Sequence, residues 1–100
     1  MRRLDVSPLA QADFYEIADF SSWNFGHKQT DRYLEDFDEI FLSLLEFPRL
    51  GKTVHYDGRE FHRVRCGSHY AYYVFDDELL RVLRVIHISR DQAEAMKAVP

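Results

Sequence analysis

The sequence is poor in the residues that interrupt or crosslink a chain: one cysteine, three prolines and four glycines among 100 residues. Cys66 has no partner, which excludes an internal disulfide framework and fits a reducing compartment. No apolar run approaches the roughly 20 residues that span a bilayer, and Met1 to Asp5 lacks the apolar core of a signal peptide. With 46% hydrophobic residues, we expect one folded cytoplasmic domain over residues 1–100.

A basic excess is also missing, and lysine is scarce. The net charge is −4, and the lysines are Lys28, Lys52 and Lys97. Residues 1–50 hold five Lys or Arg against ten Asp or Glu, whereas residues 51–100 hold eight against seven. Proteins that bind nucleic acid through its phosphates usually carry a marked positive excess. Direct nucleic-acid binding by this chain alone is therefore disfavoured, except through a local patch in the second half.

The sequence contains no recognisable cofactor or metal signature. His55 and His62 form no metal-ligand spacing with a carboxylate or cysteine. Neither a P-loop nor a dinucleotide fingerprint is present. We therefore expect no metal and no cofactor.

Two helices are predicted in the first half. Ser7 and Pro8 are typical of a helix start, and Gly26 suits the left-handed conformation that ends a helix. A connection this short between two helices predicts an antiparallel helical hairpin, and Pro48 ends it. The first helix has one small-to-medium apolar stripe, from which Asp13 is expected to point away: Ala10, Phe14, Ile17, Ala18 and Ser21. The second, from about 27 to 47, has a wider aromatic face: Tyr33, Phe37, Ile40, Phe41, Leu44 and Leu45.

Strands are predicted at the N-terminus and throughout the second half. Residues 2–6 form a short strand, residues 52–58 read as a loop, and a β meander then follows over residues 60–66, 69–75 and 79–87. Residues 92–99 allow a short C-terminal helix. The pattern predicts an α+β fold of order β-α-α-β-β-β, with the helical hairpin packed on an antiparallel sheet.

Both faces of the last two strands of the meander are apolar. Tyr70, Tyr72 and Val74 point to one side, and Ala71, Tyr73 and Phe75 to the other. One helical hairpin can cover one face only. The second face needs residues 92–99, another copy of the chain or a different protein, and we expect a partner protein.

In its motifs the chain resembles the RelE/ParE superfamily of toxins from bacterial type II toxin–antitoxin pairs, most closely the ParE branch. The matching residues occur in order along nearly the whole chain: Leu4, Ser7-Pro8-Leu9-Ala10, Asp13, Ile17, Trp23-Asn24-Phe25-Gly26, Gln29, Tyr33-Leu34, Pro48-Arg49-Leu50-Gly51-Lys52, Arg63, Gly67-Ser68-His69, Tyr73, Leu83-Arg84-Val85-Ile86-His87, Ser89 and Asp91. The resemblance implies the same β-α-α-β-β-β topology. It also implies a cognate antitoxin, ParD-like or of another class, whose disordered segment folds over the toxin. Operator DNA would then be contacted only through the antitoxin complex.

The resemblance leaves the target open. The ParE branch implies inhibition of DNA gyrase by binding, with no catalytic residues. The RelE branch implies a ribosome-dependent messenger RNA endonuclease, which needs a base, a cation and an acid at the scissile phosphate. The candidates for those roles are Arg65, Arg84, His87 and Arg90, with Tyr73 as a further donor. The simpler reading makes His87 and His69 structural residues at strand ends.

We therefore favour a gyrase-binding toxin without catalytic residues. The alternatives are an endoribonuclease that uses Arg65, His87, Arg90 and Tyr73, and an interaction module without toxicity. The arginines of the second half could line a phosphate groove, pair with acids of the second helix or pair with an acidic antitoxin. The residues expected to contact the antitoxin are Tyr70, Tyr72, Val74, Phe37, Phe41, Arg63 and Arg84.

Overall fold

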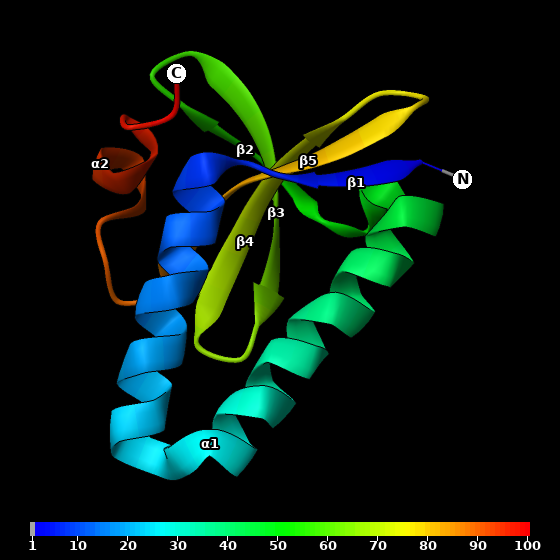
Figure 1. Ribbon diagram of the computed structural model, residues 1–100. Coiled ribbons are helices and arrows are strands. Elements are labelled where there is room, and N and C mark those ends of the chain that lie inside the picture. Colours follow the sequence, from blue (N-terminus) through cyan, green and yellow to red (C-terminus); the bar gives the residue numbers. More distant parts are fainter. Residues whose placement is uncertain (1) are drawn as a thin grey trace.

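A five-stranded sheet with helices on both faces forms the fold in the computed structural model, which describes residues 2–100 (Figure 1). The strand order is β1-β5-β4-β3-β2. The strands are β1 (Arg3–Val6), β2 (Lys52–Tyr56), β3 (Arg59–Cys66), β4 (His69–Phe75) and β5 (Leu79–His87); the helices are α1 (Pro8–Glu46), α2 (Gln92–Met96) and a short 3-10 turn (Pro48–Leu50). The predicted α+β class and the short C-terminal helix are confirmed.

The sheet is mixed, because β1 runs parallel to β5. Arg3 pairs with Leu79 and Val6 with Val82, whereas all the other neighbouring strands are antiparallel. The expectation of an antiparallel sheet was therefore wrong for β1. The β2–β5 meander leaves only its two edges free, and β1 joins it at β5 through the long crossover that a parallel pair requires.

Strand β2 lies where a loop was predicted. Lys52 pairs with Arg63 and Tyr56 with Arg59, and the intervening Asp57 and Gly58 have φ values of 52° and 76°. Positive φ at both central residues is typical of the type I′ hairpin turn favoured by Asp-Gly. The strand was missed because β2 is an exposed edge strand, whose side chains show no clear alternation.

Helix α1 has two arms that meet at Gly26. That residue has φ 81° and ψ 169° inside an otherwise helical segment, and the arms diverge from it as a V (Figure 1). The side chain of Ser7 caps the first arm by accepting a hydrogen bond from the backbone N–H of Ala10 at 3.1 Å, and Pro8 follows it. The predicted helical hairpin is therefore present, with an open angle between its arms.

Two cores lie on opposite faces of the sheet. The larger one joins Phe37, Phe41 and Leu44 of α1 to the sheet around Tyr73 and Val82. The smaller one packs the C-terminal segment against the other face: Ala95, Met96 and Val99 against Phe61, Tyr72 and Ile86. The expectation that a partner protein must cover this second face is corrected, because α2 and Val99 already cover its centre. Within residues 2–100, no helix is apolar over a length sufficient to cross a membrane.

Candidate functional site

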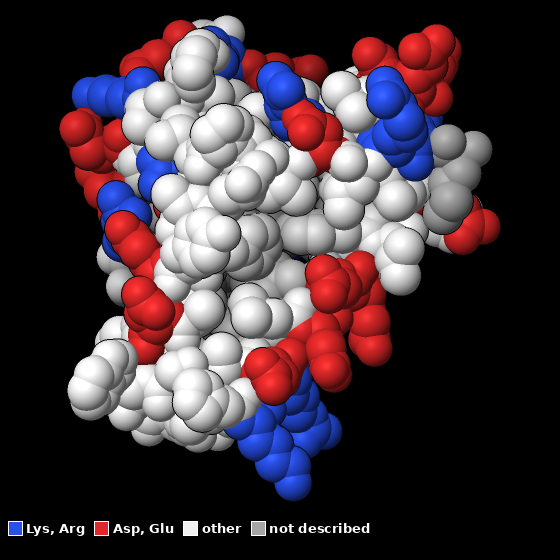
Figure 2. Space-filling model, in the orientation of Figure 1, with Lys and Arg blue, Asp and Glu red and all other residues white. Residues whose placement is uncertain are grey.

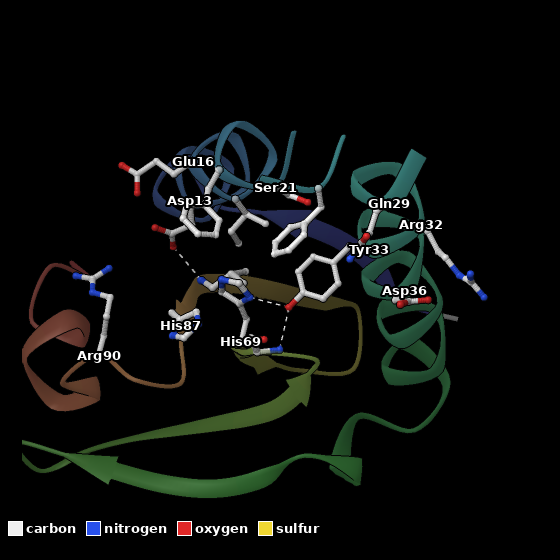
Figure 3. A pocket seen from close by; sticks show the side chains of 15 residues that line it. Asp13, Glu16, Ser21, Gln29, Arg32, Tyr33, Asp36, His69, His87 and Arg90 are labelled. Carbon is white, nitrogen blue, oxygen red and sulfur yellow. Dashed lines mark hydrogen bonds between the residues drawn. The ribbon is translucent and has the colours of Figure 1, made fainter. Parts of the chain in front are cut away.

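A groove of about 680 Å³ lies where β4 and β5 meet the two arms of α1 (Figure 3). Both arms form its walls, and the ends of β4 and β5, with the segment that follows β5, form its base. Apolar side chains alternate with ionisable ones along it: Ile17, Phe20, Phe25, Tyr33 and Val85, with Asp13, Glu16, Arg32, Asp36, His69, His87 and Arg90. The end of the strand predicted over residues 79–87 thus opens into a hollow.

A buried ion pair supports the base of this groove. Asp13 accepts hydrogen bonds from Arg84 Nε at 2.9 Å and Nη2 at 2.7 Å, and from the backbone N–H of Val85 at 2.9 Å. Arg84 Nη1 also donates to Ala95 O at 2.9 Å, so the pair links α1, β5 and the C-terminal segment. The hydrogen bonds that Arg84 donates to the Asp13 carboxylate raise the pKa of Arg84 above its ordinary value. The side chains of Asp13 and Arg84 are therefore hydrogen-bonded to each other and to the backbone inside the protein.

Asp13 also completes a strand edge that has no neighbouring strand. Strand β1 ends at Val6, so the outer edge of β5 has no neighbouring strand beyond Val82. Ser7 takes over part of this edge: its N–H donates to Val82 O at 3.0 Å and its hydroxyl to Leu83 O at 2.9 Å. The carboxylate of Asp13 accepts the hydrogen bond from the backbone N–H of Val85, further along the same edge of β5. From the sequence, Asp13 was expected to point away from the apolar stripe, and this role was therefore missed. The available signal was its spacing, because a residue three positions after Ala10 lies next to Ala10 on the helix surface.

Two histidines and a tyrosine meet inside the groove. His69 Nδ1 lies 2.7 Å from the hydroxyl of Tyr33, which is 3.0 Å from Cys66 O and accepts from Ser68 N–H at 3.0 Å. The ring centroids of His69 and His87 are 5.2 Å apart. Burial, with a smaller contribution from His87, lowers the pKa of His69 to about 4. His69 is therefore uncharged at neutral pH.

His87 is oriented by the turn after β5. The backbone N–H of Ser89 donates to His87 Nδ1 at 3.1 Å, and the Ser89 hydroxyl lies 2.7 Å from the same atom. A nitrogen that accepts from an N–H carries no proton, so the neutral ring holds its hydrogen on Nε2. The ring itself lines the groove (Figure 3).

Comparison with known proteins decides the family. A family model described as "ParE toxin of type II toxin-antitoxin system, parDE" matches residues 4–92. The chain belongs to the ParE toxin family. It is 29% identical over 87 residues to "Toxin ParE1" from two Mycobacterium tuberculosis strains, H37Rv and CDC 1551 / Oshkosh, covering 86% of this chain and 89% of each relative. The predicted resemblance to the ParE branch is confirmed.

A solved structure supports the fold of this ParE-family toxin. The structure titled "Chromosomal ParDE TA system from P. aeruginosa" superposes with a TM-score of 0.74, covering 89% of this chain and 98% of the other. Sequence identity is 17%, so the likeness concerns the fold alone.

The ParE-family chain does not bring together the four residues of the endoribonuclease alternative. His87 and Arg90 both line the groove. Tyr73 is fully buried, and its hydroxyl donates to Pro48 O at 2.6 Å and accepts from Gly51 N–H at 3.0 Å. Arg65 leaves β3 on the face opposite Cys66, away from α1, and its Nε donates to Gly67 O at 2.9 Å.

The residues expected to contact the antitoxin divide into two sets. Those engaged inside the chain are Phe37, Phe41, Tyr72 and Arg84, with exposed fractions of 1%, 3%, 0% and 9%. The sheet surface away from α1 keeps Arg63, Tyr70 and Val74. We call these three residues the open sheet face. Aromatic stripes predict burial but not the partner, which is why Phe37 and Phe41 were assigned to an interface.

An arginine stacked on a tyrosine organises the open sheet face. Arg63 Cζ lies 4.1 Å from the ring centroid of Tyr70, within cation–π range. Its Nη1 donates to the hydroxyls of Tyr56 and Tyr72 at 3.2 and 3.4 Å. Val74 is 36% exposed beside Arg81, its partner on β5. The face therefore presents positive charge on a fixed aromatic platform.

Across residues 2–100, no three His, Cys, Asp or Glu side chains are arranged to hold a metal ion. The groove and the open sheet face lie on opposite sides of the sheet, since α1 covers one face and the Arg63–Tyr70 pair occupies the other.

Proposed function

We propose that this ParE-family toxin acts by binding DNA gyrase and that a cognate antitoxin neutralises it. The observation that carries the proposal is the separation of the catalytic candidates. Tyr73 is locked in the core, and Arg65 projects from the face opposite His87. A phosphodiester cleavage site needs its proton donor, proton acceptor and cation within hydrogen-bond reach of one phosphate. Binding asks for no such constellation.

The chemistry of the groove supports a protein target over RNA. Glu16 and Asp36 line it together with exposed apolar rings, and carboxylates repel a phosphate backbone. His69 is neutral above about pH 4 and adds no positive charge near pH 7. An apolar groove with a few polar groups suits the side chains of a protein segment.

One observation favours a second candidate, a messenger RNA endonuclease. His87 and Arg90 both line the groove, and His87 presents Nε2 rather than the Ser89-bound Nδ1. This pair supplies one proton-transfer group and one cation.

Gyrase supercoiling and transcript cleavage separate the two candidates. The purified toxin should inhibit supercoiling by gyrase in vitro, and its induction should leave messenger RNA 5′ ends unchanged. His87→Ala should retain both gyrase inhibition and growth arrest. Codon-phased cleavage of transcripts, abolished by His87→Ala, would establish the nuclease instead. Inhibition of neither gyrase nor growth would indicate an interaction module without toxicity.

For the antitoxin, we propose contact through Arg63, Tyr70 and Val74. The positive charge of Arg63 favours an acidic antitoxin segment, and the tyrosine ring offers apolar area at small entropic cost. Phe37, Phe41, Tyr72 and Arg84 would act only by supporting this surface from below. We further propose a cytoplasmic complex that contacts operator DNA through the antitoxin.

Co-purification with the neighbouring ParD-like antitoxin tests that contact. Tyr70→Ala combined with Arg63→Ala should reduce retention of the antitoxin on tagged toxin. Lys52→Ala, which removes an exposed positive charge from the edge strand β2, is the matched control and should retain it. Equal retention by both variants would place the antitoxin elsewhere.

A further inference from the structure

Three large aromatic side chains lie exposed where the arms of α1 meet. Phe20, Trp23 and Phe25 have exposed fractions of 67%, 89% and 58%. We call these three residues the elbow. It forms the end of the V that is most distant from the sheet (Figure 1). Phe20 and Phe25 also line the groove, whereas Trp23, between them in the chain, does not.

The fold itself does not need these rings. None of the three belongs to either core or pairs with another aromatic ring in the described part of the chain. The turn is made by Gly26, where an added Cβ would meet nothing within 4 Å. Clustered exposed aromatics without a packing role mark interaction surfaces, and tryptophan is enriched among residues that dominate binding energy.

The charges around the elbow define what kind of surface it fits. Carboxylates flank it on both arms: Glu16 and Asp19 before it, and Asp31, Glu35 and Asp36 after it; the basic residues between them are Lys28 and Arg32. The balance is −3. The salt bridges found within residues 2–100 involve none of these side chains. Figure 2 shows acidic groups on both sides of an uncharged surface between the arms. A complementary partner therefore has an apolar cleft with a basic rim.

We propose that the elbow is the surface that engages the target protein, with Trp23 inserted into an apolar cleft bordered by Lys or Arg side chains. This inference rests on the proposed function, in that the target is a protein and not RNA. The elbow belongs to α1, whereas the open sheet face lies on the other side of the sheet. Target and antitoxin therefore use different residues.

Elbow variants of the full chain test this division. Trp23→Ala should weaken binding to purified gyrase on the order of 30-fold, as expected for the truncation of a dominant interface residue. Phe47→Ala is the control, because Phe47 is likewise an exposed aromatic residue, at 58%, but lies at the C-terminal end of α1. It should bind gyrase within about two-fold of the unsubstituted chain. Both variants should retain the antitoxin and the thermal unfolding midpoint, since neither side chain is packed.

The basic rim is tested through charge. Asp31→Lys with Glu35→Lys should lower the association rate with gyrase, and this loss should shrink as salt is raised. Asp77→Lys with Glu78→Lys, at exposed positions of the β4–β5 turn, is the charge-matched control and should associate as the unsubstituted chain does. An equal loss in both pairs would overturn the proposed complementarity.

Two outcomes would overturn the inference as a whole: Trp23→Ala binds gyrase as tightly as Phe47→Ala, or it loses the antitoxin together with gyrase. If Trp23→Ala unfolds, Trp23→Leu, which keeps apolar area, replaces it and must show the selective loss of gyrase binding; gyrase binding as tight as that of Phe47→Ala then overturns the inference. Failure of the unsubstituted chain to bind gyrase would refute the gyrase proposal separately. In that case growth arrest tests the elbow. If Trp23→Ala abolishes growth arrest and Phe47→Ala does not, the result supports the elbow as the target-binding surface. If both variants still arrest growth, the elbow is excluded.

Discussion

Removal of Asp13 should destabilise the protein more than any surface substitution. Asp13→Ala leaves the guanidinium of Arg84 in a site where the arginine is 9% exposed, and it strips the Val85 N–H of its acceptor. Removing one partner of a buried ion pair costs about 3–5 kcal/mol. A domain of this size has a total stability of about 5–15 kcal/mol, so the change consumes a large share of it.

The assay is urea unfolding at pH 7, followed by far-ultraviolet circular dichroism. Asp19→Ala, an exposed acid on the same arm of α1, is the matched control and should change the free energy of unfolding by less than about 0.5 kcal/mol. Asp13→Leu combined with Arg84→Met should recover much of the loss, because no unpaired charge remains buried. A cost below about 1 kcal/mol for Asp13→Ala would refute the reasoning, since the pair would then not be holding α1 to β5.

Two further substitutions probe the groove and its surroundings. Because burial and His87 lower the pKa of His69 from 6.5 to about 4, its contribution to stability is complete above pH 6.5 and is lost as pH falls toward 4. This loss amounts to about 1–2 kcal/mol after solvent screening of a half-buried ring. Between pH 7 and pH 4.5 the urea unfolding midpoint should fall less in His69→Gln than in the unsubstituted chain. Equal falls in the two proteins would contradict the prediction. Tyr73→Phe should cost about 1–3 kcal/mol, because Pro48 O and Gly51 N–H lose their partner. It should leave gyrase inhibition per folded molecule unchanged, and a folded but inactive variant would point to a functional hydroxyl.

Local sequence signals predicted most of the elements. The Ser7-Pro8 start, the break at Gly26 and the turns between β3, β4 and β5 each depend on residues adjacent in the chain, so they could be predicted directly. Which strands pair with one another could not be predicted from such local signals. Which strand β1 joins depends on where the meander leaves a free edge, and no periodicity in residues 2–6 reports that edge or the direction of pairing.

The functional residues were harder to predict for the same reason. His87 and Arg90 are near neighbours in sequence, and the structure places both at the groove. Asp13 and Arg84 are 71 residues apart, and neither carries a local sign of its partner. Tyr73 and Arg65 have the right chemistry for catalysis, but strand alternation directs one into the core and the other to the opposite face. Residue type alone does not say which of the two faces of the sheet a strand residue occupies; the pairing register of the strand is also needed.

The parallel pairing of β1 with β5 bears on how the toxin first forms during synthesis. Asp5 and its hydrogen-bond partner Arg81 are 76 residues apart. At 5–20 residues per second, a ribosome needs about 4–15 s to make the intervening chain. Until then β1 has no strand to join, and the apolar stripe of α1 has no complete sheet to cover. The nascent toxin therefore assembles its N-terminal edge last, and a truncated translation product lacking β5 should possess neither a closed core nor the groove.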